Sequence, residues 1–129
     1  MAGSITTKRI YLPTARTDGA RILVDRLWPR GVRREDAFID FWAKEVSPST
    51  ELRKWYQHDH KKWPSFRKKY WAELDTHAPD KFDRITELLN SGDITLVFSS
   101  KEENLNNARA LKEYLEEKLY RELQSNPSQ

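Results

Sequence analysis

The 129-residue chain contains no cysteine, and this absence excludes several kinds of chemistry. It rules out disulfides, thiolate nucleophiles and zinc sites with cysteine ligands. No apolar run approaches the roughly 20 residues that a membrane helix needs. The start of the chain, Met1-Ala2-Gly3-Ser4, lacks the apolar segment of a secretory signal. We therefore expect a cytoplasmic protein without a membrane partner.

Glycine is also scarce, with four residues scattered at positions 3, 19, 31 and 92. The chain therefore has no glycine-rich phosphate loop. It also lacks the G-x-S-x-G motif of many hydrolases and the H-E-x-x-H motif of zinc proteases. Because no complete catalytic set can be read, the sequence assigns neither an enzymatic activity nor a cofactor nor an oligomeric state.

The sequence is rich in charged residues, and its apolar residues are regularly spaced. Charged residues make up 33% of the chain, which indicates a strongly hydrated surface, and the formal net charge is only +3. The apolar residues lie in periodic clusters, which is typical of a folded domain and not of a disordered chain. The length suits one domain. We place it at residues 8–123, between an N-terminal tail (1–7) and a C-terminal tail (124–129).

Segments whose residue pattern predicts strands alternate with segments whose pattern predicts helices. We expect strands at Lys8 to Leu12, Arg21 to Leu27 and Ile94 to Phe98, and the continuous apolar runs in the last two predict burial on both faces. The pattern from Ala37 to Val46 fits either a helix or a strand, with a strand from about Phe41 favoured. This alternation predicts an α/β fold: a single-domain sandwich with a small, at least partly parallel sheet flanked by helices.

Helical periodicity predicts the connecting elements. Ser49 is expected to cap a short helix. A longer helix is expected from about Lys61 to Leu74, with Pro64 in its first turn, and Asp80 is expected to begin another.

The last helix carries an apolar stripe formed by Leu105, Ala108, Leu111, Leu115 and Leu119. Its start fits a capping box of Ser100 with Glu103, or alternatively a cap at Asn104.

Polar residues follow two of the expected strands. One strand runs into Asp25, Arg26, Trp28 and Arg30, and the other runs into the segment Ser99 to Asn107 before the last helix. Ligands of open α/β sheets collect at the carboxyl ends of strands. A helix N-terminus and arginine side chains both attract phosphate or carboxylate. If the two strands are parallel neighbours, these residues form one anion pocket.

The leading hypothesis is a protein that binds an anionic ligand there, either a nucleotide or a phosphorylated metabolite. In this hypothesis arginines and Lys101 neutralise the ligand, Asn106 or Asn107 orients it, and Trp28 covers it. The structural alternative is that the arginines pair with acids such as Asp36 or Glu45. For Asp25, a salt bridge to an arginine is favoured over an acid–base role.

A second function class remains open. The run from Lys61 to Tyr70 mixes cations with aromatics, as nucleic-acid-binding surfaces do, although helical spacing favours aromatics in the core. A nucleic-acid-binding module that uses the Lys61–Lys69 face is therefore the alternative, and an interaction protein without a small ligand is the third. His58-Asp59-His60 is unsuitably spaced for a metal on one helix face, so we interpret it as a solvated loop without metal.

Several motifs stand out together: Leu23–Gly31, Trp42–Ser49, Leu52–Asp59, Thr95–Lys101 and Asn106–Ala108. They resemble the YeaO-like family of uncharacterised proteins, a domain of unknown function, and the likeness runs from about Lys8 to Leu119. The resemblance implies a compact α/β domain. A wider branch carries a cysteine-containing loop where Ser99 to Asn107 lies here, so a thiol-based mechanism cannot carry over.

The resemblance also marks recurring polar positions. In this chain they are Asp25, Arg26, Arg30, Lys44, Arg53, His58, Lys101, Asn106 and Asn107. Combined with the strand ends, they give our candidate ligand-binding residues: Asp25, Arg26, Trp28, Arg30, Lys44, Lys101, Asn106 and Asn107.

Overall fold

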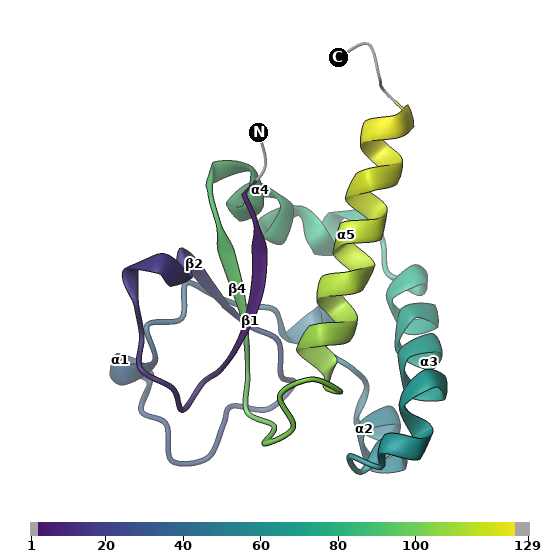
Figure 1. Ribbon diagram of the computed structural model, residues 1–129, viewed down its shortest axis with the longest axis horizontal. Helices are drawn as coiled ribbons and strands as arrows, with labels where there is room; N and C mark the ends of the chain where they lie inside the picture. The colour runs from purple at the N-terminus through teal and green to yellow at the C-terminus, as the bar shows by residue number, and fades with distance from the viewer. Residues whose placement is uncertain (1–2, 126–129) are drawn as a thin grey trace.

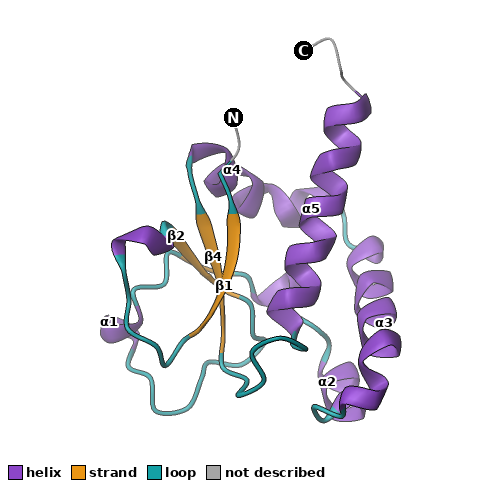
Figure 2. Cartoon of the chain, viewed as in Figure 1, coloured by secondary structure: helices purple, strands orange, loops and turns teal. Residues whose placement is uncertain are grey.

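The computed structural model describes the backbone of residues 3–125 and the side chains of residues 3–118. Its four strands form one wholly parallel sheet in the order β1-β4-β2-β3. Figure 2 shows β4 between β1 and β2. The strands are β1 Ile5–Arg9, β2 Ala20–Leu23, β3 Phe41–Trp42 and β4 Ile94–Phe98. The helices are α1 Arg34–Ala37, α2 Thr50–Tyr56, α3 Trp63–Thr76, α4 Asp83–Ser91 and α5 Asn107–Ser125. The α/β fold with a parallel sheet is confirmed.

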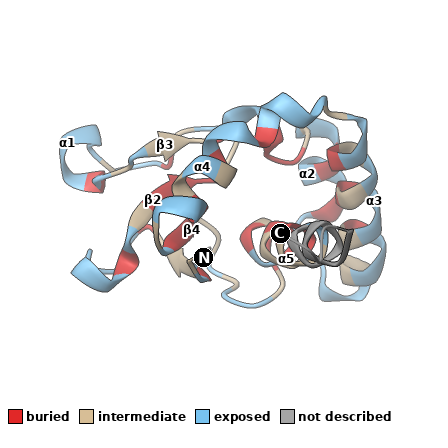
Figure 3. Ribbon diagram, turned by 90° about the horizontal axis from the view of Figure 1, so that it is seen from above, coloured by how far each residue is buried: buried red, intermediate tan, exposed pale blue. Residues whose placement is uncertain are grey.

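Helices cover the two faces of the sheet unequally. Helices α2, α3 and α5 lie on one side of the strands and the short α1 on the other (Figures 1 and 3). The larger apolar cluster takes Ile22 and Leu96 from the central strands. The smaller one takes Leu23 and Val97 and packs them beneath α1. Neighbouring residues of β2 and β4 thus point to opposite faces, so the expected burial on both faces is confirmed.

The first strand begins earlier than expected. Ile5 pairs with Ile94 and is 7% exposed, so residues 5–7, expected in the N-terminal tail, are part of the sheet. The β-branched run Ile-Thr-Thr suits a strand. Beyond Arg9 the chain turns, with the amide of Leu12 donating to the carbonyl of Arg9 at 3.1 Å. The predicted strand from Lys8 to Leu12 was therefore displaced toward the C-terminus.

The strands β2 and β3 are shorter than expected. β2 ends at Leu23 and not at Leu27, although the amide of Val24 still donates to the carbonyl of Val97. β3 covers only Phe41–Trp42, and residues 44–46 form a 3-10 turn in place of the predicted strand continuation. The amide of Ala43 makes the last sheet bond, to Leu23, and the chain then turns toward α2.

The three predicted helices before β4 are present, but two of them begin later than expected. Ser49 caps α2 by accepting a hydrogen bond from the amide of Leu52 at 3.1 Å, as expected. Pro64 lies in the first turn of α3, which begins at Trp63 after a 3-10 turn and not at Lys61. A 3-10 turn over residues 79–82 likewise precedes α4, so Asp80 lies within that turn and does not begin the helix.

The last helix extends into the expected C-terminal tail, because residues 124 and 125 are helical; residues 126–129 of that tail lie outside the described part. The side chain of Leu119, expected on the apolar stripe, also lies outside it, whereas Ala108, Leu111 and Leu115 are buried. Within residues 3–125, no helix combines the length and apolar character needed to cross a bilayer.

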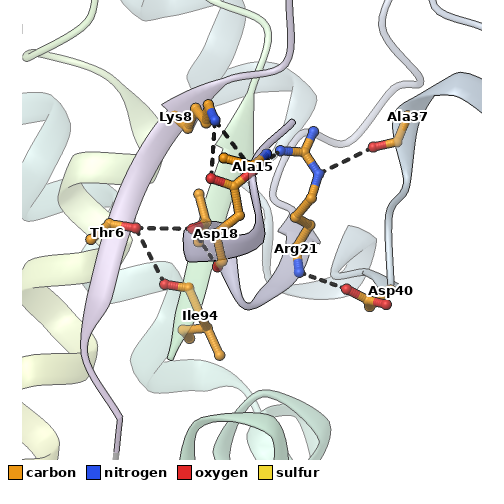
Figure 4. A network of polar contacts seen from close by, with 9 residues as sticks. Thr6, Lys8, Ala15, Asp18, Arg21, Ala37, Asp40 and Ile94 are labelled. Carbon is orange, nitrogen blue, oxygen red and sulfur yellow. Dashed lines mark hydrogen bonds and ion pairs between the residues drawn. The ribbon is translucent and has the colours of Figure 1, made fainter. Parts of the chain in front are cut away.

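A charged network lies beside the smaller apolar cluster (Figure 4). Asp18, 6% exposed, accepts bonds from Lys8 at 3.0 Å and from Arg21 at 2.7 Å. The amide of Ala15 also donates to it. Burial opposes the charge of Asp18, but these hydrogen bonds outweigh burial and hold its pKa below the ordinary value. In the described part of the chain, Arg21 Nη2 is the one buried polar side-chain atom without a partner.

This network gives a stability prediction. The variant Asp18→Asn leaves Arg21 as a buried cation without an ion partner. We expect its free energy of unfolding at neutral pH to fall by about 3 kcal/mol. Urea denaturation followed by tryptophan fluorescence measures this loss.

The same variant tests the pH dependence. The contribution of Asp18 is complete above its unfolded pKa of about 3.9 and is lost as pH falls through the lower folded pKa. Acidification through this window should therefore destabilise the wild type more than Asp18→Asn. The control Asp36→Asn, in an exposed pair with Arg33, should change stability by less than about 0.5 kcal/mol. Equal losses in both variants would contradict the assignment.

Candidate functional site

A pocket lies where the adjacent strands β2 and β4 end. Its cavity volume is about 130 Å³. The loop that leads into α5 leaves the sheet here and passes between the end of β4 and the helices (Figure 1). We call this cavity the strand-end pocket. Its lining residues are Asp25, Arg26, Pro48, Arg53, Tyr56, His58, Phe66, Ser99, Ser100, Asn106 and Asn107.

Asp25 joins the elements around the strand-end pocket. Its carboxylate accepts hydrogen bonds from the amide and hydroxyl of Ser99, at 3.0 and 2.5 Å, and from Asn107 Nδ2 at 3.1 Å. Asn107 Nδ2 also donates to the carbonyl of Val24 at 2.7 Å. Within the described residues Asp25 forms no ion pair, so its expected salt bridge to an arginine is replaced by hydrogen bonds from neutral donors.

Arg26 is held by the main chain. Its Nε donates to the carbonyl of Pro48 at 3.0 Å, and its Nη2 donates to that of Ser47 at 2.9 Å. No carboxylate among the described residues pairs with it. A guanidinium carries five N–H groups, so these two bonds leave three donors free. Arg26 therefore presents a fixed cation that forms no ion pair with any described acid.

Arg53 and His58 reach the strand-end pocket from α2 and the turn after it. Arg53 is exposed, and its guanidinium makes no hydrogen bond or ion pair with any described residue. Gln57 and His58 have φ of 47° and 58°, a left-handed conformation that residues other than glycine seldom adopt. This turn brings His58 Nδ1 to 3.4 Å from the hydroxyl of Ser100.

Local hydrogen bonds shape the loop between β4 and α5. The Ser100 hydroxyl accepts from the amide of Glu102 at 3.1 Å. The carboxylate of Glu102 accepts from the amides of Asn104 and Leu105, and these bonds hold the pKa of Glu102 below its ordinary value. Asn106 Nδ2 donates to the carbonyl of Glu102 at 2.7 Å. The loop is therefore a structured wall of the strand-end pocket.

Asn106 caps α5. Its Oδ1 accepts a hydrogen bond from the amide of Arg109 at 2.9 Å, and the residue is 1% exposed. The predicted capping box of Ser100 with Glu103 is wrong, as is the alternative cap at Asn104. Both were placed too early because the residues before Asn106 form a turn and not the first turn of the helix.

Tyr56 forms an apolar wall with a neutral hydroxyl. Its ring stacks on Phe66 with centroids 4.2 Å apart, and its hydroxyl donates to the carbonyl of Leu105 at 2.8 Å. Burial, with the nearby charges of Glu102 and Asp59, raises the pKa of Tyr56 to about 12. The phenol therefore stays protonated at neutral pH and cannot serve there as a base.

Comparison with known proteins identifies the family. A family model described as the inactive DUF488-N3 subclade matches residues 4–129. The chain belongs to the DUF488 family. The uncharacterized protein YeaO of Escherichia coli (strain K12) is 41% identical over 112 residues, which are 87% of this chain and 96% of YeaO. The uncharacterized protein Rv3073c of Mycobacterium tuberculosis is 40% identical over 74 residues, or 57% of this chain and 63% of that protein. No solved structure is significantly similar. The YeaO-like resemblance is thus confirmed.

In this DUF488 protein, five candidate residues lie at or beside the strand-end pocket. Four of them line it: Asp25, Arg26, Asn106 and Asn107. Lys101 lies in a shallower depression that continues from the strand-end pocket and shares with it His58, Ser99 and Ser100. Our candidate list omitted Arg53, His58, Ser99 and Ser100. For Arg53 and His58, the recurring polar positions of the family were the signal that could have found them.

Three candidate residues lie elsewhere. Trp28 packs in the smaller apolar cluster on the opposite face, where its Nε1 donates to the carbonyl of Val32 at 2.7 Å. Arg30 is exposed and does not line the strand-end pocket. Lys44 lies over the ring of Trp42, 5.1 Å from its centroid, in a depression beside β3. Trp28 therefore cannot cover a ligand in the strand-end pocket.

The histidines of the segment 58–60 have separate partners. His58 faces Ser100, whereas His60 Nε2 lies 3.1 Å from Glu102. Among the described residues, no group of three or more His, Asp or Glu side chains is arranged to hold a metal ion.

The two competing caps of α5 can be separated by mutation. Asn106→Ala removes a buried cap and its second bond to the loop, so we expect the free energy of unfolding to fall by about 2 kcal/mol. Asn104→Ala should change it by less than about 0.5 kcal/mol, because Asn104 is exposed and its side chain caps nothing. Thermal or urea unfolding of both variants measures the difference, and the reverse order of effects would show that Asn104 is the cap.

Proposed function

We propose that this DUF488 protein binds a small anionic ligand, a nucleotide or a phosphorylated metabolite, through an anionic group in the strand-end pocket. The observation that carries the proposal is the pair of guanidinium groups, Arg26 and Arg53, lining one cavity without an ion pair to any described residue. Guanidinium groups bind phosphate and carboxylate with paired hydrogen bonds. An anion bound by both guanidinium groups would give them the ion partner that no described residue provides.

The size of the cavity defines which part of the ligand it would hold. A volume of about 130 Å³ is well below the roughly 300–1,000 Å³ of pockets that bury a whole drug-sized ligand. This suits a single phosphate or carboxylate group and not a whole nucleotide. The rest of a larger ligand would extend over the adjoining depression, where Lys101 adds a further positive charge.

Binding is better supported than catalysis. The subclade to which the family model assigns this chain is described as inactive. The phenol of Tyr56 is protonated at neutral pH, and the Asp25 carboxylate is engaged by three donors that hold the loops together. These features fit a receptor or carrier for the anion.

The nucleic-acid alternative has weaker support. Along the Lys61–Lys69 face, Arg67 is paired with Glu113 at 2.8 Å, and both Lys62 and Lys69 lie over the ring of Trp55. Phe66, which could otherwise stack on a base, is buried in the core. The face therefore has fewer free cations and stacking rings than its sequence suggests.

Charge-conserving variants test the anion proposal. In Arg26→Lys, the ammonium group cannot make both carbonyl bonds and also bind phosphate with two parallel hydrogen bonds. We therefore expect the affinity for inorganic phosphate to fall by about tenfold or more. The affinity of Arg53→Lys for phosphate should fall less, because the Arg53 side chain makes no hydrogen bond to the described protein that the change could remove. Arg53→Ala should weaken binding by a further severalfold. Isothermal titration calorimetry measures each affinity.

The control is Arg30→Ala, which removes an exposed arginine outside the strand-end pocket and should leave phosphate affinity unchanged. If Arg26 variants lose stability while phosphate binds as in the wild type, Arg26 is structural and the proposal fails.

A further inference from the structure

The strand-end pocket contains an acid as well as two cations. Asp25 lines the same cavity as Arg26 and Arg53. An acid beside an anion is unfavourable unless a proton lies between them, since two acceptors without a hydrogen only repel. The position of Asp25 therefore bears on which anions can enter.

A count of hydrogen bonds shows what Asp25 can still accept. A carboxylate offers about four lone-pair sites on its two oxygens. The amide and hydroxyl of Ser99 both donate to Oδ2, at 3.0 and 2.5 Å, which fills that oxygen. Asn107 Nδ2 donates to Oδ1 at 3.1 Å. One acceptor site on Oδ1 is left for a donor that the described residues do not provide.

The small cavity brings a ligand close to this site. Because Asp25 and both arginines line one cavity of about 130 Å³, we expect a tetrahedral oxyanion bound by the arginines to bring one of its oxygens beside Asp25. The same carboxylate is fixed by its bonds to Ser99 and Asn107, so it cannot swing aside without breaking them.

We propose that Asp25 makes the strand-end pocket selective for oxyanions that carry a proton, namely hydrogen phosphate and singly protonated phosphate monoesters. Their P–OH group donates to Oδ1 of Asp25 while the arginines bind the remaining oxygens. Fully ionised sulfate and phosphate diesters have no such donor and are rejected. This inference rests on the proposed function, because it assigns the selectivity of the same anion site.

Phosphate and sulfate are the first pair of probes. At about pH 8 both carry close to two negative charges, and hydrogen phosphate differs from sulfate chiefly by its one proton. At matched ionic strength, calorimetry on the wild-type protein should give a dissociation constant for phosphate about tenfold or more below that for sulfate. Equal affinities, or tighter sulfate binding, would overturn the inference.

The outcomes separate this inference from the proposed function. If both anions bind equally and both lose affinity in Arg26→Lys, the anion site stands and the selectivity of Asp25 does not. If neither anion binds, both proposals fail.

Phosphate esters provide a second test that needs no mutation. At about pH 5, monomethyl phosphate and dimethyl phosphate both carry about one negative charge, but only the monoester has a P–OH group. The monoester should bind more tightly to the wild-type protein, and equal binding would contradict the role of Asp25.

The variant Asp25→Asn assigns the selectivity to this side chain. Its amide can donate to an anion, so the phosphate preference should shrink toward equality or reverse in favour of sulfate. Circular dichroism establishes that the variant is folded. In the control Asp36→Asn, an exposed acid outside the strand-end pocket, the preference should persist. An unchanged preference in folded Asp25→Asn would show that the selectivity arises elsewhere.

Discussion

The carboxylate of Asp25 joins three parts of the chain that are far apart in the sequence. It follows β2, receives two hydrogen bonds from Ser99 after β4, and receives a third from Asn107 in the first turn of α5. Parallel pairing puts the two strand ends side by side, and this carboxylate, together with the bond from Asn107 Nδ2 to the carbonyl of Val24, connects the loops beyond them. The walls of the strand-end pocket therefore share one side chain, which accepts hydrogen bonds from two of the three segments and belongs to the third.

Much of the fold could be predicted from local pattern. The continuous apolar runs at residues 22–24 and 96–98 identified the two central strands, because a strand covered on both faces needs apolar residues on both. The start of β1 at Ile5 was missed because a single apolar residue followed by two threonines carries little periodic signal. Its assignment comes from pairing with Ile94, which is a tertiary contact.

The candidate site was predictable only in part, for a related reason. Asp25, Arg26, Asn106 and Asn107 follow or precede regular elements, so the expected convergence of strand ends was enough to place them together. Arg53 and His58 reach the strand-end pocket only because α2 folds back toward the loop before α5. Trp28 was expected at the pocket but lies away from it. After β2 ends, the chain crosses to the other face of the sheet, where the Trp28 ring packs against Trp42. No spacing rule in the sequence encodes that crossing.

The polar groups of the site differ in how firmly they are held, and this difference divides their roles. Arg26 and Asp25 are fixed by bonds to the main chain and to neighbouring side chains, so their positions are set before any ligand arrives. Arg53 and Lys101 are exposed and lack such bonds among the described residues. Fixed groups discriminate between ligands of similar charge because they cannot adapt to the wrong one. Free cations attract any anion and mainly raise the rate of encounter. Selectivity should therefore reside in the Asp25–Arg26 pair, and charge attraction in Arg53 and Lys101.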